Sequence, residues 1–263
     1  MPENEAERRV REFLEAQHFR VRRIDALPEE QRADFHVTHG SEVYIVEVKG
    51  MAGDEQYTRD LAERGDTIRE DRIGRTNPVS KRIRESAEQL RSTPADTTVF
   101  RIISLVAIGD DPDVQADQFI STIYGIIDLI IPGDGGSARA LPCFYFTFNE
   151  FFKMPDVDAL LVLKPSASRI CLNSFCTRAR TFRQSKLWQL HVHHGAFCDP
   201  VEMEARGEAF IADCDLDRHH ESLVRDYIRT KYRMDNLPPH LPIVSHPAKY
   251  TAAKIADWAE RRP

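Results

Sequence analysis

Three side chains that can do hydrolytic chemistry lie close together near the start of the chain. Asp34 belongs to the run Arg-Ala-Asp-Phe-His-Val-Thr-His-Gly, and Glu47 and Lys49 lie near the end of Ser-Glu-Val-Tyr-Ile-Val-Glu-Val-Lys-Gly. Both runs are rich in apolar residues, and His39-Gly40-Ser41 between them is typical of a tight turn. The sequence therefore predicts a β-hairpin with an acid on one strand and an acid and a lysine on the other.

The second strand of this hairpin is expected to end in two opposite charges on one face. Side chains alternate between the faces of a strand, so Glu47 and Lys49 point the same way and Val48 points to the other face. Removing ionised groups from water costs free energy unless a partner compensates them. A divalent cation held by Asp34 and Glu47 would compensate that cost and leave Lys49 available to act on a substrate.

Helical and strand patterns alternate around this hairpin. Apolar residues at helical spacing predict amphipathic helices over residues 5–17 and 80–92, and alternation predicts a strand over 19–24. The continuous apolar run 99–108 predicts a buried strand. This order of elements predicts an α/β fold with a central mixed β-sheet flanked by helices. The highly charged segment 50–78 is expected to be an exposed insertion with a helix over 57–64.

The second half of the chain has weaker patterns. Residues 114–127 suit a helix, although 126–131 also suit a strand. Further strands are expected over 143–148, 160–163 and 169–175, and helices over 181–190 and 221–233.

Composition bounds the class of protein. The 263 residues are enough for one elaborated domain or two small ones. The apolar runs are too short to span a bilayer, and we expect neither a signal segment nor membrane association. Five cysteines without a Cys-x-x-Cys pair favour free thiols in a cytoplasmic setting. The net charge of −6 leaves nucleic-acid binding open, because the distribution of charge decides it.

The N-terminal part resembles the PD-(D/E)xK nuclease superfamily, and within it the archaeal Holliday-junction resolvases most closely. The matching segments are Glu5-Ala6-Glu7-Arg8-Arg9, His18-Phe19-Arg20-Val21, Ala33-Asp34-Phe35 and Ile45-Val46-Glu47-Val48-Lys49. One departure is Ala33, which stands where the family has a proline. The resemblance covers residues 5–108, and it implies a restriction-endonuclease-like core over 1–110. Residues 111–263 would then form an α+β elaboration that continues the domain.

The resemblance also implies a set of site residues. In the family, a helix glutamate, a strand aspartate, and the glutamate and lysine of the E-x-K strand make the metal site, and a later helix adds a polar residue. The matching positions here are Glu7, Asp34, Glu47 and Lys49, with Gln89 as the later polar residue and Ser86 and Lys81 behind it. Each has an ordinary alternative: the triplet as a solvated strand end, Glu7 as an acid at a helix start, and Gln89 as an exposed helix residue.

The implied chemistry is hydrolysis of a phosphodiester. Oxygen ligands select Mg²⁺ or Mn²⁺, and Asp34 and Glu47 would supply carboxylates, with the Val48 carbonyl and Glu7 as further ligands. The metal would act as a Lewis acid and lower the pKa of water. Lys49 would orient that water or stabilise the developing negative charge.

A second region carries a local excess of positive charge. Residues 159–198 contain no Asp or Glu but include Lys164, Arg169, Arg178, Arg180, Arg183 and Lys186. We expect phosphate contacts from the last four of these, with Phe182 and Trp188 next to bases. The alternative is a solvated face that is balanced by acids elsewhere.

Other side chains with chemical potential are expected to be structural. His191 and His193 would share a metal if they lay two apart on a strand, but no acidic or cysteine partner has a suitable spacing. Cys171 and Cys176 suit a core. The aromatic residues between Phe144 and Phe152 favour a core over a base-stacking platform.

The sequence favours a Mg²⁺-dependent endonuclease that acts on DNA, with homodimerisation open. A second hypothesis is a catalytically inactive nuclease-fold protein that binds nucleic acid or a protein partner. A third is a structural or regulatory protein that binds neither DNA nor metal. The sequence does not distinguish DNA from RNA or duplex from branched substrates.

Overall fold

The structure is a computed structural model that describes residues 3–25, 32–53, 55–132, 137–234, 238–240, 242–248, 250, 256–257 and 260. In this part of the chain, no helix is long and apolar enough to cross a membrane.

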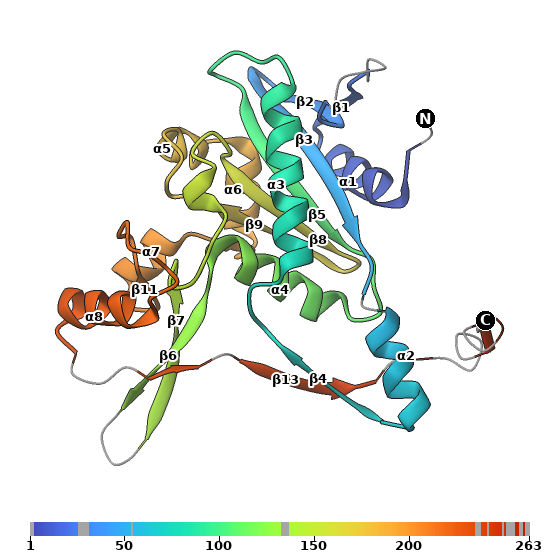
Figure 1. The fold of residues 1–263 in the computed structure, drawn as a ribbon. Helices are drawn as coiled ribbons and strands as arrows, with labels where there is room; N and C mark the ends of the chain where they lie inside the picture. The colour runs from blue at the N-terminus through green and yellow to red at the C-terminus, as the bar shows by residue number, and fades with distance from the viewer. Residues whose placement is uncertain are drawn as a thin grey trace.

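A mixed seven-stranded sheet forms the centre of the molecule (Figure 1). Its strands, in spatial order, are β1 (Arg20–Arg23), β2 (Phe35–His39), β3 (Glu42–Met51), β5 (Phe100–Ala107), β8 (Ala159–Lys164), β9 (Ala167–Leu172) and β10 (Phe197–Cys198). The first three pair antiparallel, β3, β5 and β8 run parallel, β9 is antiparallel to β8, and β10 is parallel to β9. The expected α/β fold with a mixed sheet is confirmed, and both halves of the chain contribute strands to it.

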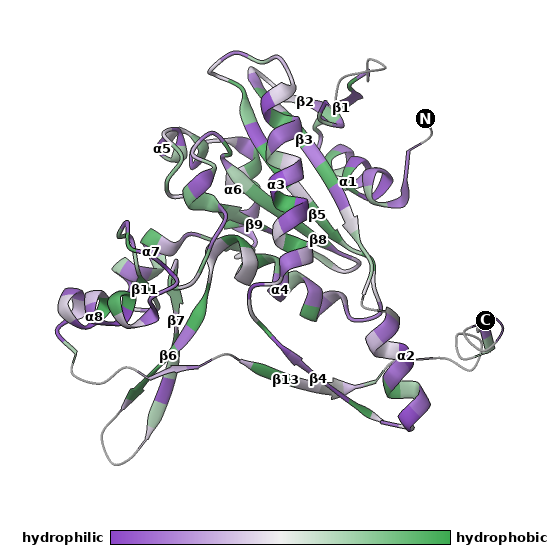
Figure 2. Cartoon of the chain, in the orientation of Figure 1, coloured by the Kyte–Doolittle hydropathy of each residue, from purple (hydrophilic) through white to green (hydrophobic). Residues whose placement is uncertain are grey.

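Helices cover both faces of this sheet. One face packs against α3 (Asn77–Ser92) and α4 (Pro112–Tyr124), whose buried residues join a core with Ile45, Ile103 and Leu160. The other face packs against α1 (Glu5–Ala16), α5 (Ala179–Phe182) and α6 (Lys186–His193). Figure 2 shows hydrophobic residues concentrated in the central strands between these layers.

The hairpin that carries the candidate site has the expected form. β2 and β3 join at Gly40, whose φ of +59° is a left-handed conformation that glycine adopts without steric cost. Within β3, Ile45 belongs to the core under α3, whereas Tyr44, Val46 and Val48 belong to the core under α1. The alternation predicted for this strand is therefore confirmed.

Two smaller sheets extend from the central one. The first contains β11 (Phe210–Ile211), β7 (Ala138–Phe144), β6 (Ile127–Pro132) and β12 (Pro239–His240), and it packs against α8 (Glu221–Tyr232). The second contains β4 (Ile68–Arg72) and β13 (Ile243–Pro247). The remaining elements are α2 (Glu55–Arg64), a 3₁₀ turn (Phe151–Lys153) and α7 (Pro200–Ala205).

Some expectations for individual elements were wrong. The helix expected over 57–64 is present as α2, but the segment after β3 also contains β4, which was not expected, and Arg69 and Asp71 of β4 are buried. The strand expected over 143–148 ends at Phe144, since Tyr145 is left-handed with φ 62°. A helix and a strand were both predicted near residue 126, and both are present one after the other. α4 ends at Tyr124, and β6 begins at Ile127.

Candidate active site

The pairing of β2 with β3 places Asp34 beside Glu47. The register pairs Phe35 with Val46, and one further step along the antiparallel pair sets Asp34 opposite Glu47. Residues directly opposite each other in an antiparallel pair point to the same face of the sheet. The two carboxyl groups therefore meet on the face that α3 covers.

A backbone N–H orients Asp34. Its Oδ2 accepts a hydrogen bond from the N–H of Val48 at 2.8 Å. Because β2 begins only at Phe35, the aspartate side chain takes the place of a backbone partner at this point of the ladder. The N–H and C=O of one strand residue point to the same side, so the Val48 carbonyl also faces Asp34. The Val48 carbonyl would therefore be available to a cation that the two carboxyl groups share.

Glu47 is a buried carboxyl group with incomplete partners. Glu47 is 0 % exposed, because β3 lies inside the sheet between β2 and β5. Nζ of Lys49 lies 2.5 Å from Oε1 as an ion pair. Neither Glu47 oxygen, however, has a hydrogen bond of normal geometry within the described part of the chain. Burying a carboxylate in this way is costly.

The electrostatics of the site favour a cation. Burial, followed by the nearby carboxyl group of Asp34, raises the pKa of Glu47 to about 8, although Lys49 opposes the shift. Burial also raises the pKa of Asp34, against the Val48 N–H and Lys49. Burial and then Asp34 raise the pKa of Glu7, which Arg23 opposes. All three shifts disfavour negative charge, and a bound cation would reverse them.

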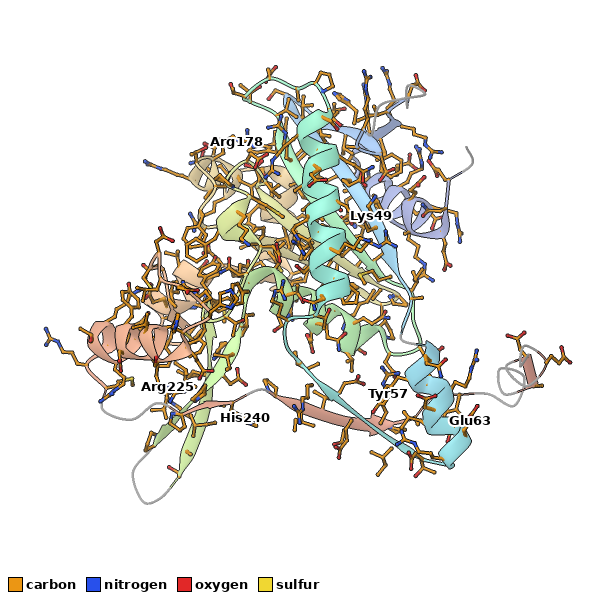
Figure 3. The ribbon with its side chains drawn as sticks, in the orientation of Figure 1. Lys49, Tyr57, Glu63, Arg178, Arg225 and His240 are labelled. Atoms are coloured by element: carbon orange, nitrogen blue, oxygen red, sulfur yellow. The ribbon has the colours of Figure 1, made fainter. Side chains whose placement is uncertain are left out.

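Gln89 of α3 reaches Lys49. The Lys49 ammonium donates to Oε1 of Gln89 at 2.7 Å and is also paired with Glu47. Figure 3 shows Lys49 on β3 beside α3. The lysine side chain keeps 22 % of its surface exposed, so it is held in position yet reachable from solvent. The structure thus brings together Asp34, Glu47, Lys49 and Gln89, whereas Ser86 bonds to the Arg82 carbonyl and Lys81 pairs with Glu85.

Glu7 approaches from the helix on the opposite face. Asn4 caps α1 by accepting from the Glu7 N–H at 3.0 Å, and its side-chain amide donates to Glu7 Oε1 at 2.5 Å. Arg23 of β1 lies 2.9 Å from Glu7 Oε2. Asn4 and Arg23 are therefore contacts of the site that the sequence reasoning missed. The available signals were the cap preference of asparagine and the arginine at the end of the alternating strand.

The donor set fits a hard divalent cation bound by two carboxylates. Within the described ranges, no group of three or more His, Cys, Asp or Glu side chains is arranged to hold a metal ion. The fitting donors are Asp34, Glu47 and the Val48 carbonyl, with Glu7 held by Arg23 behind them. Mg²⁺ suits such a set, because it commonly takes one or two carboxylates and keeps several waters.

The basic block is the positively charged stretch over residues 159–198, and two of its arginines form ion pairs with buried aspartates. Arg178 donates to buried Asp158 from Nε and Nη2, at 3.0 and 2.6 Å, and Arg183 donates to buried Asp199 at 2.6 and 3.1 Å. Arg180 and Lys186 are exposed. Phe182 and Trp188 are buried in the core under α1, so they are not available to stack on bases.

This block also lies away from the carboxylates. The Lys186 N–H bonds to Glu42, which is five residues before Glu47, so α6 begins about 16 Å along the strand from that acid. In Figure 3, Arg178 and Lys49 lie on opposite sides of α3. Phosphate contacts by Arg180 and Lys186 stay a prediction, and they would lie at a distance from Asp34 and Glu47.

The remaining candidates are structural. His191 lies on a helix and not on a strand, so the strand arrangement considered for a shared metal is wrong. It is buried and bonds to the Leu187 carbonyl and the Ser168 hydroxyl. Cys171 and Cys176 are free, buried thiols, and Phe144, Phe146 and Phe151 are in the core, as expected.

The chain was compared with protein-family models, with curated proteins and with solved structures, and none of the three comparisons found a match.

Proposed function

We propose that the protein is a metal-dependent endonuclease that hydrolyses DNA phosphodiester bonds on a restriction-endonuclease-like core. One observation carries the proposal. Glu47 is fully buried, neither of its oxygens has a hydrogen bond of normal geometry within the described residues, and burial and Asp34 raise its pKa to about 8. Strongly perturbed carboxyl groups that converge with a lysine are typical of catalytic sites. Here the set consists of Asp34, Glu47 and Lys49, which are also the residues that the family resemblance names.

Asp34, Glu47 and the Val48 carbonyl would hold Mg²⁺ or Mn²⁺. When bound, the cation supplies positive charge next to the scissile phosphate and acidifies a nearby water molecule. The Val48 N–H fixes Asp34 in the orientation that this role requires. Glu7 adds negative charge behind Asp34 and is itself balanced by Arg23.

Lys49 acts directly on the substrate. Its ammonium donates hydrogen bonds to a phosphate oxygen or to the attacking water as negative charge develops. Gln89 holds the ammonium at 2.7 Å and so acts as a positioning residue. Removing a single preorganised donor of this kind costs about 10²–10³ in rate.

The test is a cleavage panel with linear, supercoiled, branched and single-stranded DNA and with RNA, in Mg²⁺, Mn²⁺ or EDTA. We expect metal-dependent cleavage of DNA and a loss of about 10²–10³ in rate for Lys49→Ala. Lys81→Ala is the matched control, because this lysine is exposed and its ion pair with Glu85 lies within α3. Cleavage by Lys49→Ala at the wild-type rate, or no cleavage of any substrate, would refute the proposal.

A second function has two observations in its favour. The Lys49 ammonium already lies 2.5 Å from Oε1 of Glu47, and the described residues include no three-acid metal group. A protein with this arrangement could keep the fold and bind nucleic acid or a protein partner without cutting. Calorimetry with Mn²⁺ decides between the two: no metal binding, together with salt-sensitive DNA binding, supports the second function.

A further inference from the structure

A cavity of about 530 Å³ opens next to the candidate site, at the carboxyl ends of β3 and β5. Met51 lines it and is two residues beyond Lys49, so the cavity begins about 7 Å along the same face of the strand. Val79 of α3 and Phe119 of α4 line it from the helices that cover that face. Its volume is within the range of small-molecule sites, and the carboxyl ends of parallel strands are a common place for them.

A buried polar network fixes the outer wall of the cavity. Arg69 of β4 donates to both oxygens of Asp71, at 2.6 and 3.2 Å, and to the Thr58 hydroxyl at 3.0 Å. The guanidinium also lies 4.8 Å from the ring centre of Tyr57, which Figure 3 shows on α2. β13 pairs with β4 along its length. The wall is therefore tied to α2 and to the C-terminal strand.

The inner wall of the cavity needs a glycine. A Cβ on Gly109 would lie 2.4 Å from Nε2 of Gln115 and 2.5 Å from the backbone N of Gly53. The Gly109 N–H donates to Oε1 of Gln115 at 3.1 Å. The loop after β5 thus packs directly on α4 and on the end of β3. Both walls are preorganised, as a binding site requires.

The charge of the lining excludes one class of ligand. Asp71, Asp110 and Asp111 contribute three negative charges against the single positive charge of Arg69, which leaves a net charge of −2. A phosphate or carboxylate would be repelled here. The lining instead suits a neutral or cationic ligand that donates hydrogen bonds to carboxylates, with an apolar body against Val79 and Phe119.

One lining side chain supplies a further polar group. Gln118 of α4 is half-buried, and its amide makes no hydrogen bond within the described part of the chain. An amide both donates and accepts, which matches the edge of a heterocyclic base. Adenine and cytosine offer an exocyclic amine to an acceptor, whereas thymine offers a carbonyl oxygen and a methyl group.

We propose that this cavity binds a nucleobase that carries an exocyclic amino group. The choice of ligand rests on the proposed nuclease function, because a base turned out of a DNA strand into the cavity would hold its own backbone near Lys49. Enzymes that act on extruded bases read them in pockets of this kind. A free nucleoside offers the same chemistry, and the experiment separates the two sources.

The first measurement is calorimetry of the full chain with adenosine, cytidine and thymidine, without added metal. We expect adenosine or cytidine to bind at least about tenfold more tightly than thymidine, since a wrong base contact costs roughly 1–3 kcal/mol. Gln118→Ala should weaken binding about fivefold, as for one lost hydrogen bond. Gln118→Phe should weaken binding further, because it removes the amide and places a ring where the edge of the base would lie. Asp117→Phe places the same ring at the exposed neighbouring position of α4 and should leave binding unchanged.

The second measurement uses a DNA duplex with 2-aminopurine, whose fluorescence rises when the base leaves the stack. Wild-type protein and Lys49→Ala should both raise it without metal, and Gln118→Phe should not. Nucleoside binding without this rise assigns the cavity to free nucleosides. Equal or absent binding of all three nucleosides, or unchanged binding in Gln118→Phe, overturns the proposal. Adenosine binding by a protein that cleaves nothing would instead remove the nuclease function and retain the cavity.

Discussion

Two charged regions of the molecule differ in how their charges are paired. In the α5–α6 region, Arg178 and Arg183 each donate two hydrogen bonds to a buried aspartate. At the β2–β3 site, buried Glu47 has no hydrogen bond of normal geometry to any described residue, and the neighbouring Asp34 helps to raise its pKa. The paired charges hold the architecture, whereas a carboxyl group buried without such bonds is the group on which the proposed cation site depends.

The largest expected effect on stability comes from the α5–α6 region, where the buried charges are paired. Asp158→Asn keeps the size of the side chain but removes the charge that Arg178 and the Arg101 N–H use. Because breaking a buried ion pair leaves the other charge uncompensated, we expect a loss of about 3–5 kcal/mol in the free energy of unfolding. Denaturant titration at constant pH measures it. A loss below about 1 kcal/mol would show that this pair does not hold the α5–α6 region.

The equivalent substitution at the candidate site should behave differently. Burial and Asp34 raise the pKa of Glu47 to about 8, so the fold disfavours its charged form despite the contact with Lys49, and Glu47→Gln keeps the shape while removing little stabilising charge. We expect the free energy of unfolding without metal to change by less than about 1 kcal/mol.

The response to metal should be lost in the same variant. With Mg²⁺ at a hundred times its dissociation constant, the wild-type protein should gain about 2.7 kcal/mol, and Glu47→Gln should not. Paired denaturant titrations with MgCl₂ and with EDTA measure both quantities. A large loss of stability without metal would mean that Glu47 is a structural ion-pair partner like Asp158, and the contrast between the regions would fail.

The hairpin and the buried helix were predictable because their patterns are local. Alternation over residues 42–49 fixes which side chains share a face, and the helical spacing of Ile83, Ala87 and Leu90 matches their burial in α3. The proximity of Gln89 to Lys49 followed from the family resemblance and not from spacing. Asp34, Glu47 and Lys49 were identified from the sequence, and the strand register shows that the two acids lie opposite each other. The contacts of Asn4 and Arg23 with Glu7 were not predicted.

The non-local contacts were out of reach for pattern reasoning. β4 reads as a hydrophilic segment because its buried face carries Arg69 and Asp71 and its partner strand β13 follows more than 150 residues later. The basic block was misleading for a related reason. Its acid-free stretch begins directly after Asp158 and ends directly before Asp199, and these two flanking acids are the partners of Arg178 and Arg183. Counting charges only over residues 159–198 therefore left out both of the acids that neutralise these arginines.

The smallest effect concerns the two members of the basic block that stay exposed. Arg180 and Lys186 make no ion pair in the described part of the chain, so replacing both by alanine should change the free energy of unfolding by less than about 0.5 kcal/mol. If both contact phosphates, the slope of log affinity against log salt should fall in magnitude by about 0.9 for each contact. Binding of duplex DNA between 50 and 200 mM salt, followed by fluorescence anisotropy, measures that slope. Arg8→Ala with Arg20→Ala is the control, since both are exposed on other elements. An unchanged slope would make the whole α5–α6 region architectural, and DNA contacts would then have to come from elements around Lys49.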